Sequence, residues 1–124
     1  MVKVDKLKNL INTIDAIEFA YLFGSYAKET QTKQSDIDIA VYLHKEENTF
    51  DTKLKIHHKL EITLKKEIDL VVLNSAKNFS LLENIFHEGI VLKDANNDTR
   101  ILFELYKQHE ILDYKVFKRM LDVA

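Results

Sequence analysis

The order of apolar and polar residues divides the chain into alternating helices and strands. Apolar residues recur at helical spacing over 4–14, which predicts an amphipathic N-terminal helix. The run Ile17–Phe23 is short and rich in aromatic and β-branched residues, as is typical of a buried strand. Ile37–Leu43 and Ile68–Leu73 are further apolar runs of strand length. We therefore expect three buried strands at the centre of the fold.

Helical patterns and turn residues occupy the intervals between these strands. Apolar spacing predicts one helix over 50–65 and another over Phe79–Glu88. Gly89 is the expected C′ residue of the second helix, where a left-handed turn is common, and Ile90–Leu92 is predicted to be a short strand. Strands that alternate with helices predict an α/β (α+β) fold, with a mixed sheet and helices mainly on one face.

A long C-terminal helical region is expected to begin at a cap formed by Asp98 or Thr99, with a candidate break near Asp113. Its apolar residues fit either packing on the sheet or docking of a partner protein. They are Leu102, Leu105, Leu112, Val116, Phe117, Met120 and Leu121. Arg100 and Arg119, the only arginines, fit a phosphate, an acidic patch on a partner or a surface salt bridge equally well.

Composition limits the classes of protein that this chain can represent. Its 124 residues suit one domain over 1–124, and 46% hydrophobic residues suffice for a core. There is no Cys, which excludes disulfides and thiolate metal sites and leads us to expect a cytoplasmic protein. The net charge of -2 gives no broad attraction to nucleic acid, and no apolar run approaches the length of a membrane span.

Two carboxylates stand two residues apart at the start of the second predicted strand. Because alternate residues of a strand share a face, Asp36 and Asp38 point one way while Ile37 and Ile39 point into the core. At this spacing the carboxylates repel each other and can converge on one cation. Mg²⁺ binds through one or two carboxylates together with substrate phosphates. The pair therefore predicts a magnesium site, and an ordinary hydrophilic sheet face is the alternative.

One of only two glycines follows the first predicted strand. Gly24 would let a phosphate approach the backbone closely, and Ser25 would add a hydroxyl donor. Ser25 is also the expected N-cap of a short helix that runs to about Thr30, whose N-terminus would offer free N–H groups to an anion. A plain strand-to-helix turn is the alternative, but the combination with the two carboxylates favours a triphosphate site.

A third carboxylate, Asp69, lies near the start of the strand predicted over 68–73. Ile68 and Leu70 share one face of that strand, so Asp69 lies on the other. If this strand neighbours the one over 37–43, Asp69 joins the first two carboxylates. It could then bind a second metal ion or take the proton from an attacking hydroxyl. A polar residue at a strand end is the alternative.

The stretch GSYAKETQTKQSDIDIAV resembles the signature of the polymerase-β-like nucleotidyltransferase superfamily, which is Gly-Ser, ten residues, then Asp-x-Asp. Its flanks, LFGSYA and SDIDIAV, look most like the minimal nucleotidyltransferases, which are often antitoxins in HEPN/MNT toxin–antitoxin pairs. The resemblance extends to the third Asp on IDLVVL, the Glu88-Gly89 helix end and the C-terminal helix. Many relatives have Arg-Gly where this chain has Lys28-Glu29, so the loop geometry is expected to differ there.

The resemblance implies a polymerase-β-like nucleotidyltransferase core with a C-terminal helical extension. In such a site Gly24 and Ser25 would hold the phosphates of ATP. Asp36, Asp38 and Asp69 would form a catalytic triad around Mg²⁺, with two ions expected. An acceptor hydroxyl would attack the α-phosphorus of ATP, and pyrophosphate would leave. Because toxin-paired members modify a tyrosine of the toxin, we expect an AMP-transferring antitoxin in a hetero-oligomer with a HEPN-type toxin.

Two other functions remain compatible with the same residues. A small-molecule nucleotidyltransferase, such as one that modifies an antibiotic, usually carries an added substrate domain, for which this chain is short. A non-catalytic module could keep the fold and only mask a toxin, although the intact signature argues against it. His57 and His58 point about 100° apart on a helix, so we interpret them as part of a solvated face, not as a metal site.

Overall fold

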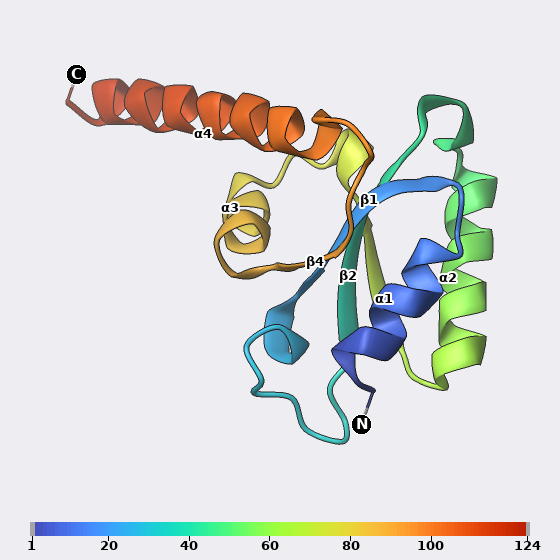
Figure 1. Cartoon of the computed structure of the whole chain (residues 1–124). Helices are drawn as coiled ribbons and strands as arrows, with labels where there is room; N and C mark the ends of the chain where they lie inside the picture. The colour runs from blue at the N-terminus through green and yellow to red at the C-terminus, as the bar shows by residue number, and fades with distance from the viewer. Residues whose placement is uncertain (1, 124) are drawn as a thin grey trace.

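A four-stranded sheet in the order β3-β2-β1-β4 forms the centre of the computed structural model, which describes residues 2–123 (Figure 1). The strands are β1 (Ile17–Phe23), β2 (Ile37–Leu43), β3 (Ile68–Val72) and β4 (Ile90–Lys93). β1 pairs antiparallel with both β2 and β4, whereas β2 and β3 run parallel. This mixed sheet confirms the predicted fold class and places β3 at one edge.

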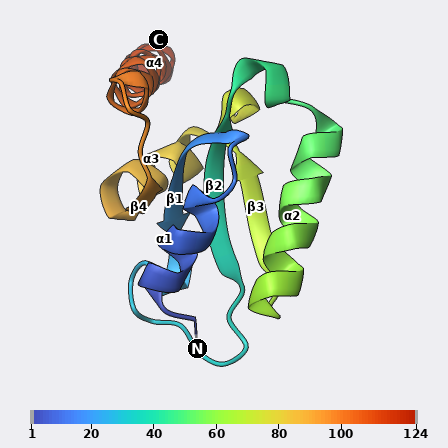
Figure 2. The same ribbon diagram turned by 45° about the vertical axis from the view of Figure 1, so that its right-hand side comes forward.

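Helices pack against both faces of the sheet (Figures 1 and 2). α1 (Val4–Asn12) and α2 (Phe50–Leu64) cover one face, and their apolar residues share a core cluster with the inward-facing residues of β2. α3 (Phe79–Glu88) and α4 (Thr99–Val123) lie on the other face. The expectation of helices mainly on one face is therefore corrected. The physical reason is β1, which presents buried side chains to both sides.

Aromatic residues dominate the core on the α3 and α4 face. The rings of Phe19 and Tyr42 are stacked with their centroids 4.7 Å apart, and Phe103 of α4 packs against both. Phe86 of α3 closes the cluster against the ring of Phe103. Tyr42 lies near the C-terminal end of β2, so this cluster covers that end. Asp38, on the same face, lies at the N-terminal end of the strand.

Two expectations about helix ends are corrected by the structure. Gly89 has φ -70° and not a left-handed conformation, because the chain passes directly into β4. A Cβ atom there would lie 2.3 Å from the carbonyl oxygen of Ile85, so close packing on the helix end explains the glycine. α4 runs through Asp113 without a break, and at its start the Asn97 side chain accepts a hydrogen bond from the Thr99 amide. No helix within residues 2–123 is both long and apolar enough to cross a membrane.

Candidate active site

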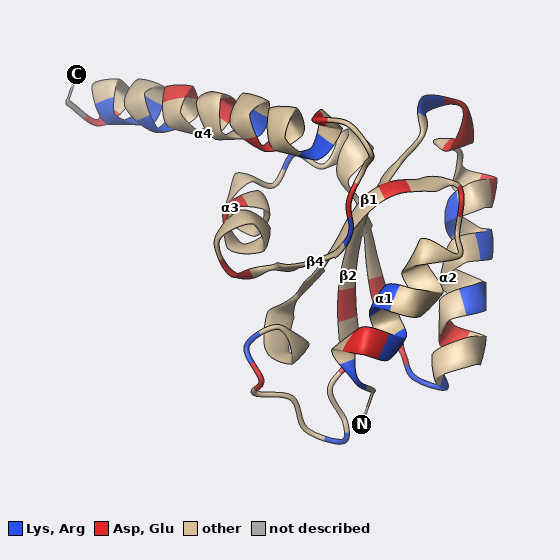
Figure 3. Ribbon diagram, viewed as in Figure 1, with Lys and Arg blue, Asp and Glu red and all other residues tan. Residues whose placement is uncertain are grey.

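The pairing of three strands gathers the three predicted carboxylates at one end of the sheet. Asp38 of β2 lies opposite Asp69 in the parallel ladder with β3, and opposite Phe23 in the antiparallel ladder with β1. Asp36 immediately precedes β2 and, like Asp69, is exposed to solvent. Figure 3 shows the acidic positions on the neighbouring strands β2 and β3. The predicted adjacency of these strands is therefore confirmed, and the carboxylates share one face.

Burial and the neighbouring carboxylates disfavour the ionised form of Asp38. Burial raises its pKa from 3.8 to about 6, helped by the charge of Asp69, a hydrogen bond with Asp69 and the charge of Asp36. Within residues 2–123, no group of three or more acidic or histidine side chains is placed so that it could hold a metal ion, so at most two of the three carboxylates are arranged to bind one together. An open pair of carboxylates suits Mg²⁺, which keeps other positions for water and phosphate oxygens. The donor set therefore fits the predicted metal.

Gly24 makes the close approach to Asp38 possible. It has φ +71°, in the left-handed region that favours glycine, and a Cβ atom there would lie 2.1 Å from Oδ2 of Asp38. The sequence suggested that Gly24 leaves space for a phosphate. The structure gives a further reason, because the Asp38 carboxylate already occupies the space of a side chain. Gly24 thus ties the turn after β1 to the carboxylate pair.

The chain after Gly24 forms a single 3₁₀ turn and not a helix that extends to Thr30. The turn covers Gly24–Tyr26, and Phe23 stands at its N-cap position, so the N-cap role predicted for Ser25 is wrong. The Ser25 carbonyl accepts a hydrogen bond from the amide of Thr30 at 3.0 Å. Glu29 has φ +58°, the conformation that glycine adopts readily. Residue 29 is thus left-handed although it is not a glycine.

Lys66 holds the loop that leads into the carboxylates, a role that sequence reasoning missed. Its ammonium group donates hydrogen bonds to the carbonyl oxygens of Lys33 and Ser35, at 2.9 and 3.0 Å. The loop is also closed on itself, because the amide of Thr32 donates to the Ser35 hydroxyl at 2.8 Å. Lys66 therefore fixes the segment immediately before Asp36 against the start of β3. No local sequence signal distinguishes it from the other lysines.

A second network joins α4 to the sheet and uses Arg100, whose role the sequence left open. The hydroxyl of Tyr21 on β1 donates to the carboxylate of Glu104. Arg100 donates to Glu104 at 3.2 Å and pairs with Asp94 at 3.1 Å. Burial and the hydrogen bond to Glu104 raise the pKa of Tyr21, so the phenol remains a donor. Arg100 is therefore engaged in anchoring α4 and is not presented to a phosphate.

Other predicted candidates have structural partners. Lys28 pairs with Glu88 at the end of α3, with 2.9 Å between the charged atoms, and so ties the turn to that helix. The Nε2 atom of His57 lies 2.8 Å from the carbonyl oxygen of Ile68 and joins α2 to β3. His57 is thus a packing residue rather than part of a fully solvated face. Neither residue belongs to the carboxylate cluster.

The turn at Gly24 lies against Asp38, which stands opposite Asp69 on the adjacent strand, as the nucleotidyltransferase signature predicts. The family described as polymerase beta, nucleotidyltransferase matches residues 5–98, and the chain belongs to this family. It is 34% identical over 97 residues to the protein adenylyltransferase MntA of Shewanella oneidensis, covering 77% of this chain and 67% of that protein. The chain is therefore a nucleotidyltransferase by family, as the signature predicted.

Solved structures resemble the chain over nearly its whole length. A toxin–antitoxin complex with AMP-PNP contains a chain with TM-score 0.70 and 30% identity, with coverage of 96% of this chain and 95% of that one. A complex of a tri-AMPylated Shewanella oneidensis HEPN toxin with an MNT antitoxin gives TM-score 0.66, 26% identity and 98% coverage of both chains. The predicted resemblance to minimal nucleotidyltransferases of HEPN/MNT pairs is thus confirmed.

Proposed function

We propose that this chain transfers AMP from ATP to a tyrosine hydroxyl of a HEPN-type toxin and so acts as its antitoxin. The observation that carries the proposal is the apposition of Asp38 and Asp69 next to Gly24, on a fold whose family transfers nucleotides. The relative from Shewanella oneidensis is named as a protein adenylyltransferase, and a structural neighbour holds an AMPylated HEPN toxin. Both names support this choice of donor and acceptor.

Each residue of the site has a proposed task. The backbone at Gly24 and the hydroxyl of Ser25 would bind the phosphates of ATP, while Asp36, Asp38 and Asp69 would hold Mg²⁺. Mg²⁺, when bound, supplies charge neutralisation for the triphosphate and the departing pyrophosphate. Asp69, which is exposed, would accept the proton as the tyrosine oxygen bonds to the α-phosphorus. The bond from the α-phosphorus to the bridging oxygen breaks, and pyrophosphate leaves with both electrons.

The domain organisation is part of the proposal. Residues 5–98, which the family model covers, would form the catalytic unit, and α4 would be an extension of a single minimal nucleotidyltransferase domain. A nucleotidyl group on a toxin tyrosine is bulky and anionic. It would repel the phosphates of RNA from a nearby active site. The toxin would then be neutralised by the transfer of AMP to its tyrosine, and not by binding of this chain alone.

Intact-mass spectrometry of a HEPN-type toxin tests this function directly. The toxin is incubated with the chain, ATP and Mg²⁺, and we expect one or more additions of the mass of AMP on tyrosine. Asp69→Asn should abolish the addition, while Asp51→Asn, which alters an exposed carboxylate on α2, should leave it unchanged. A toxin that stays unmodified but inhibited would favour the masking module. Transfer only to small molecules would favour a small-molecule nucleotidyltransferase.

A further inference from the structure

α4 separates this chain from the general nucleotidyltransferase unit. The family model ends at residue 98, and α4 begins at Thr99. A structure of the MntA–HpeT toxin–antitoxin in a mutant form nevertheless covers 98% of this chain, with TM-score 0.73 and 27% identity. Coverage of that extent includes most of the 25 residues of α4. The element beyond the shared catalytic unit is therefore retained in relatives that assemble with a toxin.

The outer surface of α4 carries an apolar stripe with the spacing of a helix-packing seam. Ten large apolar side chains between Ile101 and Leu121 are 45–67% exposed. The stripe follows steps of three or four residues along one side of the helix, with one histidine among its apolar members. Its members are Leu102, Leu105, His109, Leu112, Val116 and Met120. An apolar stripe of this kind usually packs against another helix, but on α4 it is exposed to solvent.

The opposite side of α4 is already committed to the body of the protein. Ile111 is buried, Phe103 packs in the aromatic cluster, and Tyr114 contacts the ring of Phe79 edge-on at 5.4 Å. Lys115 pairs with Glu83 of α3 at 2.8 Å. Past Lys115, no described α4 side chain belongs to either core cluster. Figure 1 shows the C-terminal half of the helix projecting away from the sheet.

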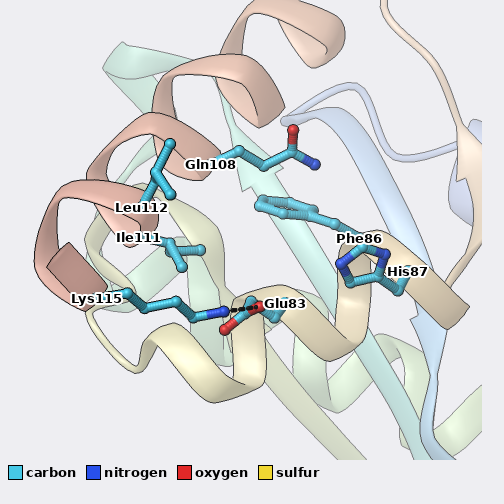
Figure 4. A pocket seen from close by; sticks show the side chains of 7 residues that line it. All are labelled: Glu83, Phe86, His87, Gln108, Ile111, Leu112 and Lys115. Atoms are coloured by element: carbon cyan, nitrogen blue, oxygen red, sulfur yellow. Dashed lines mark hydrogen bonds and ion pairs between the residues drawn. The ribbon is translucent and has the colours of Figure 1, made fainter. Parts of the chain in front are cut away.

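A pocket of about 250 Å³ lies between α3 and α4, beside the apolar stripe (Figure 4). Phe86, Ile111 and Leu112 form its apolar wall, while His87 and Gln108 add polar groups. Leu112 belongs to both the pocket and the stripe. A side chain inserted here by a docked protein would be desolvated on several sides, as is usual for an interface anchor. Pocket and stripe thus form one continuous surface.

We propose that this surface, the α4 stripe with the adjoining pocket, docks the acceptor protein of the nucleotidyl transfer. The proposal rests on the proposed function for the identity of the acceptor as a HEPN-type toxin. α3 and α4 pack on the same sheet face that presents Asp38 and Asp69, so a protein held there lies on the side of the carboxylates. Docking on α4 would bind the acceptor protein through a surface outside residues 5–98, the part that the family model covers.

The stripe and the pocket supply a large part of the area of a specific interface. The five apolar members of the stripe, 45–67% exposed, present on the order of 500 Å², and the adjoining pocket adds to this; a standard complex buries roughly 800 Å² per partner. The seam fits an apolar helix of the acceptor, because rows of residues three and four apart interdigitate between helices. A bulky apolar side chain of that helix would fill the pocket.

Binding of a catalytically inactive HEPN-type toxin to charged variants of α4 tests the proposal. Leu112→Glu and Met120→Glu place a carboxylate in the seam, and both positions are exposed, so the fold should persist by circular dichroism. Ile62→Glu makes the same change on α2, where the side chain is 60% exposed. We expect each α4 variant to raise the Kd at least about thirty-fold. Ile62→Glu should leave it within about two-fold.

The outcomes separate this inference from the proposed function. If the α4 variants lose toxin binding but still bind Mg·ATP, docking through α4 is supported whether or not the toxin is modified. If AMP transfer occurs and both variants bind toxin like the wild type, the docking surface is refuted while the proposed function stands. A wild-type dimer that buries α4 and persists in the presence of toxin would assign the stripe to a second copy and would also overturn the proposal.

Discussion

Replacing the carboxylate of Asp38 by an amide should make the metal-free protein more stable at neutral pH. Asp38 is partly buried and faces Asp69 across the β2–β3 ladder, so its charged form is disfavoured in the folded state. Asn is nearly isosteric with Asp and can donate a hydrogen bond to Asp69, which removes the repulsion without opening a cavity. A site residue would thus be destabilising in the resting fold.

The size and pH dependence of this effect follow from the pKa. In the unfolded chain Asp38 ionises near 3.8, whereas in the folded protein it ionises at about 6. Below about pH 3 both states are protonated and the penalty is absent; it grows as the pH rises above 3.8 and is nearly complete above about pH 6.5. For a fully buried carboxylate, this rise in pKa would lower the free energy of unfolding by about 3 kcal/mol at neutral pH. Because water reaches part of Asp38, we expect a gain of about 1 kcal/mol.

Urea unfolding of wild type and Asp38→Asn measures this difference. Without divalent ions, the variant should be about 1 kcal/mol more stable near pH 7.5 and nearly equal to wild type near pH 4. Mg²⁺ should then stabilise wild type but not the variant, which narrows or reverses the gap. Asp51→Asn is the control. It removes an ion pair with Lys55 that is exposed to solvent, so the free energy of unfolding should change very little. An Asp38→Asn protein that is no more stable at neutral pH, or equally more stable at both, would refute the reasoning.

Three further changes test the structure around the site. Gly24→Ala should weaken Mg·ATP binding at least about ten-fold, as measured by calorimetry. The new Cβ would collide with Asp38, and Ala disfavours φ +71°. An unchanged affinity would show that ATP binding does not depend on this close approach. Glu29→Gly should raise the free energy of unfolding by about 0.5–1 kcal/mol, since φ +58° strains the wild-type residue; a loss of stability would oppose this view. Tyr21→Phe should cost about 1–2 kcal/mol in urea unfolding, because Glu104 loses its phenol donor, and a neutral effect would show that the network does not anchor α4.

The elements with regular patterns could be predicted from the sequence. β1, β2 and α3 begin and end at the residues that the apolar patterns indicated. The face that Asp38 and Asp69 share followed from strand alternation, and their adjacency required only that β2 and β3 be neighbours. The face on which each carboxylate lies is encoded locally, because residues two apart in a strand must point the same way, whereas their proximity depends on the pairing of β2 with β3.

The remaining features depend on contacts between distant residues and left no local signal. Tyr21 and Glu104 are 83 positions apart, and neither is unusual in its own segment. Lys66 reaches back to the carbonyl of Ser35 across 31 positions. The glycine at position 89 predicts a left-handed turn, yet close packing against the carbonyl of Ile85 determines its conformation. In each case a tertiary contact overrode or replaced the local preference.

The position of β3 at the edge of the sheet has a consequence for the lifetime of the assembled site. Asp69 belongs to an edge strand, hydrogen-bonded to β2 on one side only, whereas Asp38 belongs to an interior strand. Edge strands can detach in local openings that leave the rest of a domain folded. Detachment of β3 would separate Asp69 from Asp38 while the β1–β2 pair persists. The exchange of β3 amide hydrogens with deuterated solvent would therefore report how often Asp69 separates from Asp38. If Mg·ATP binds both strands as we propose, it should slow that exchange.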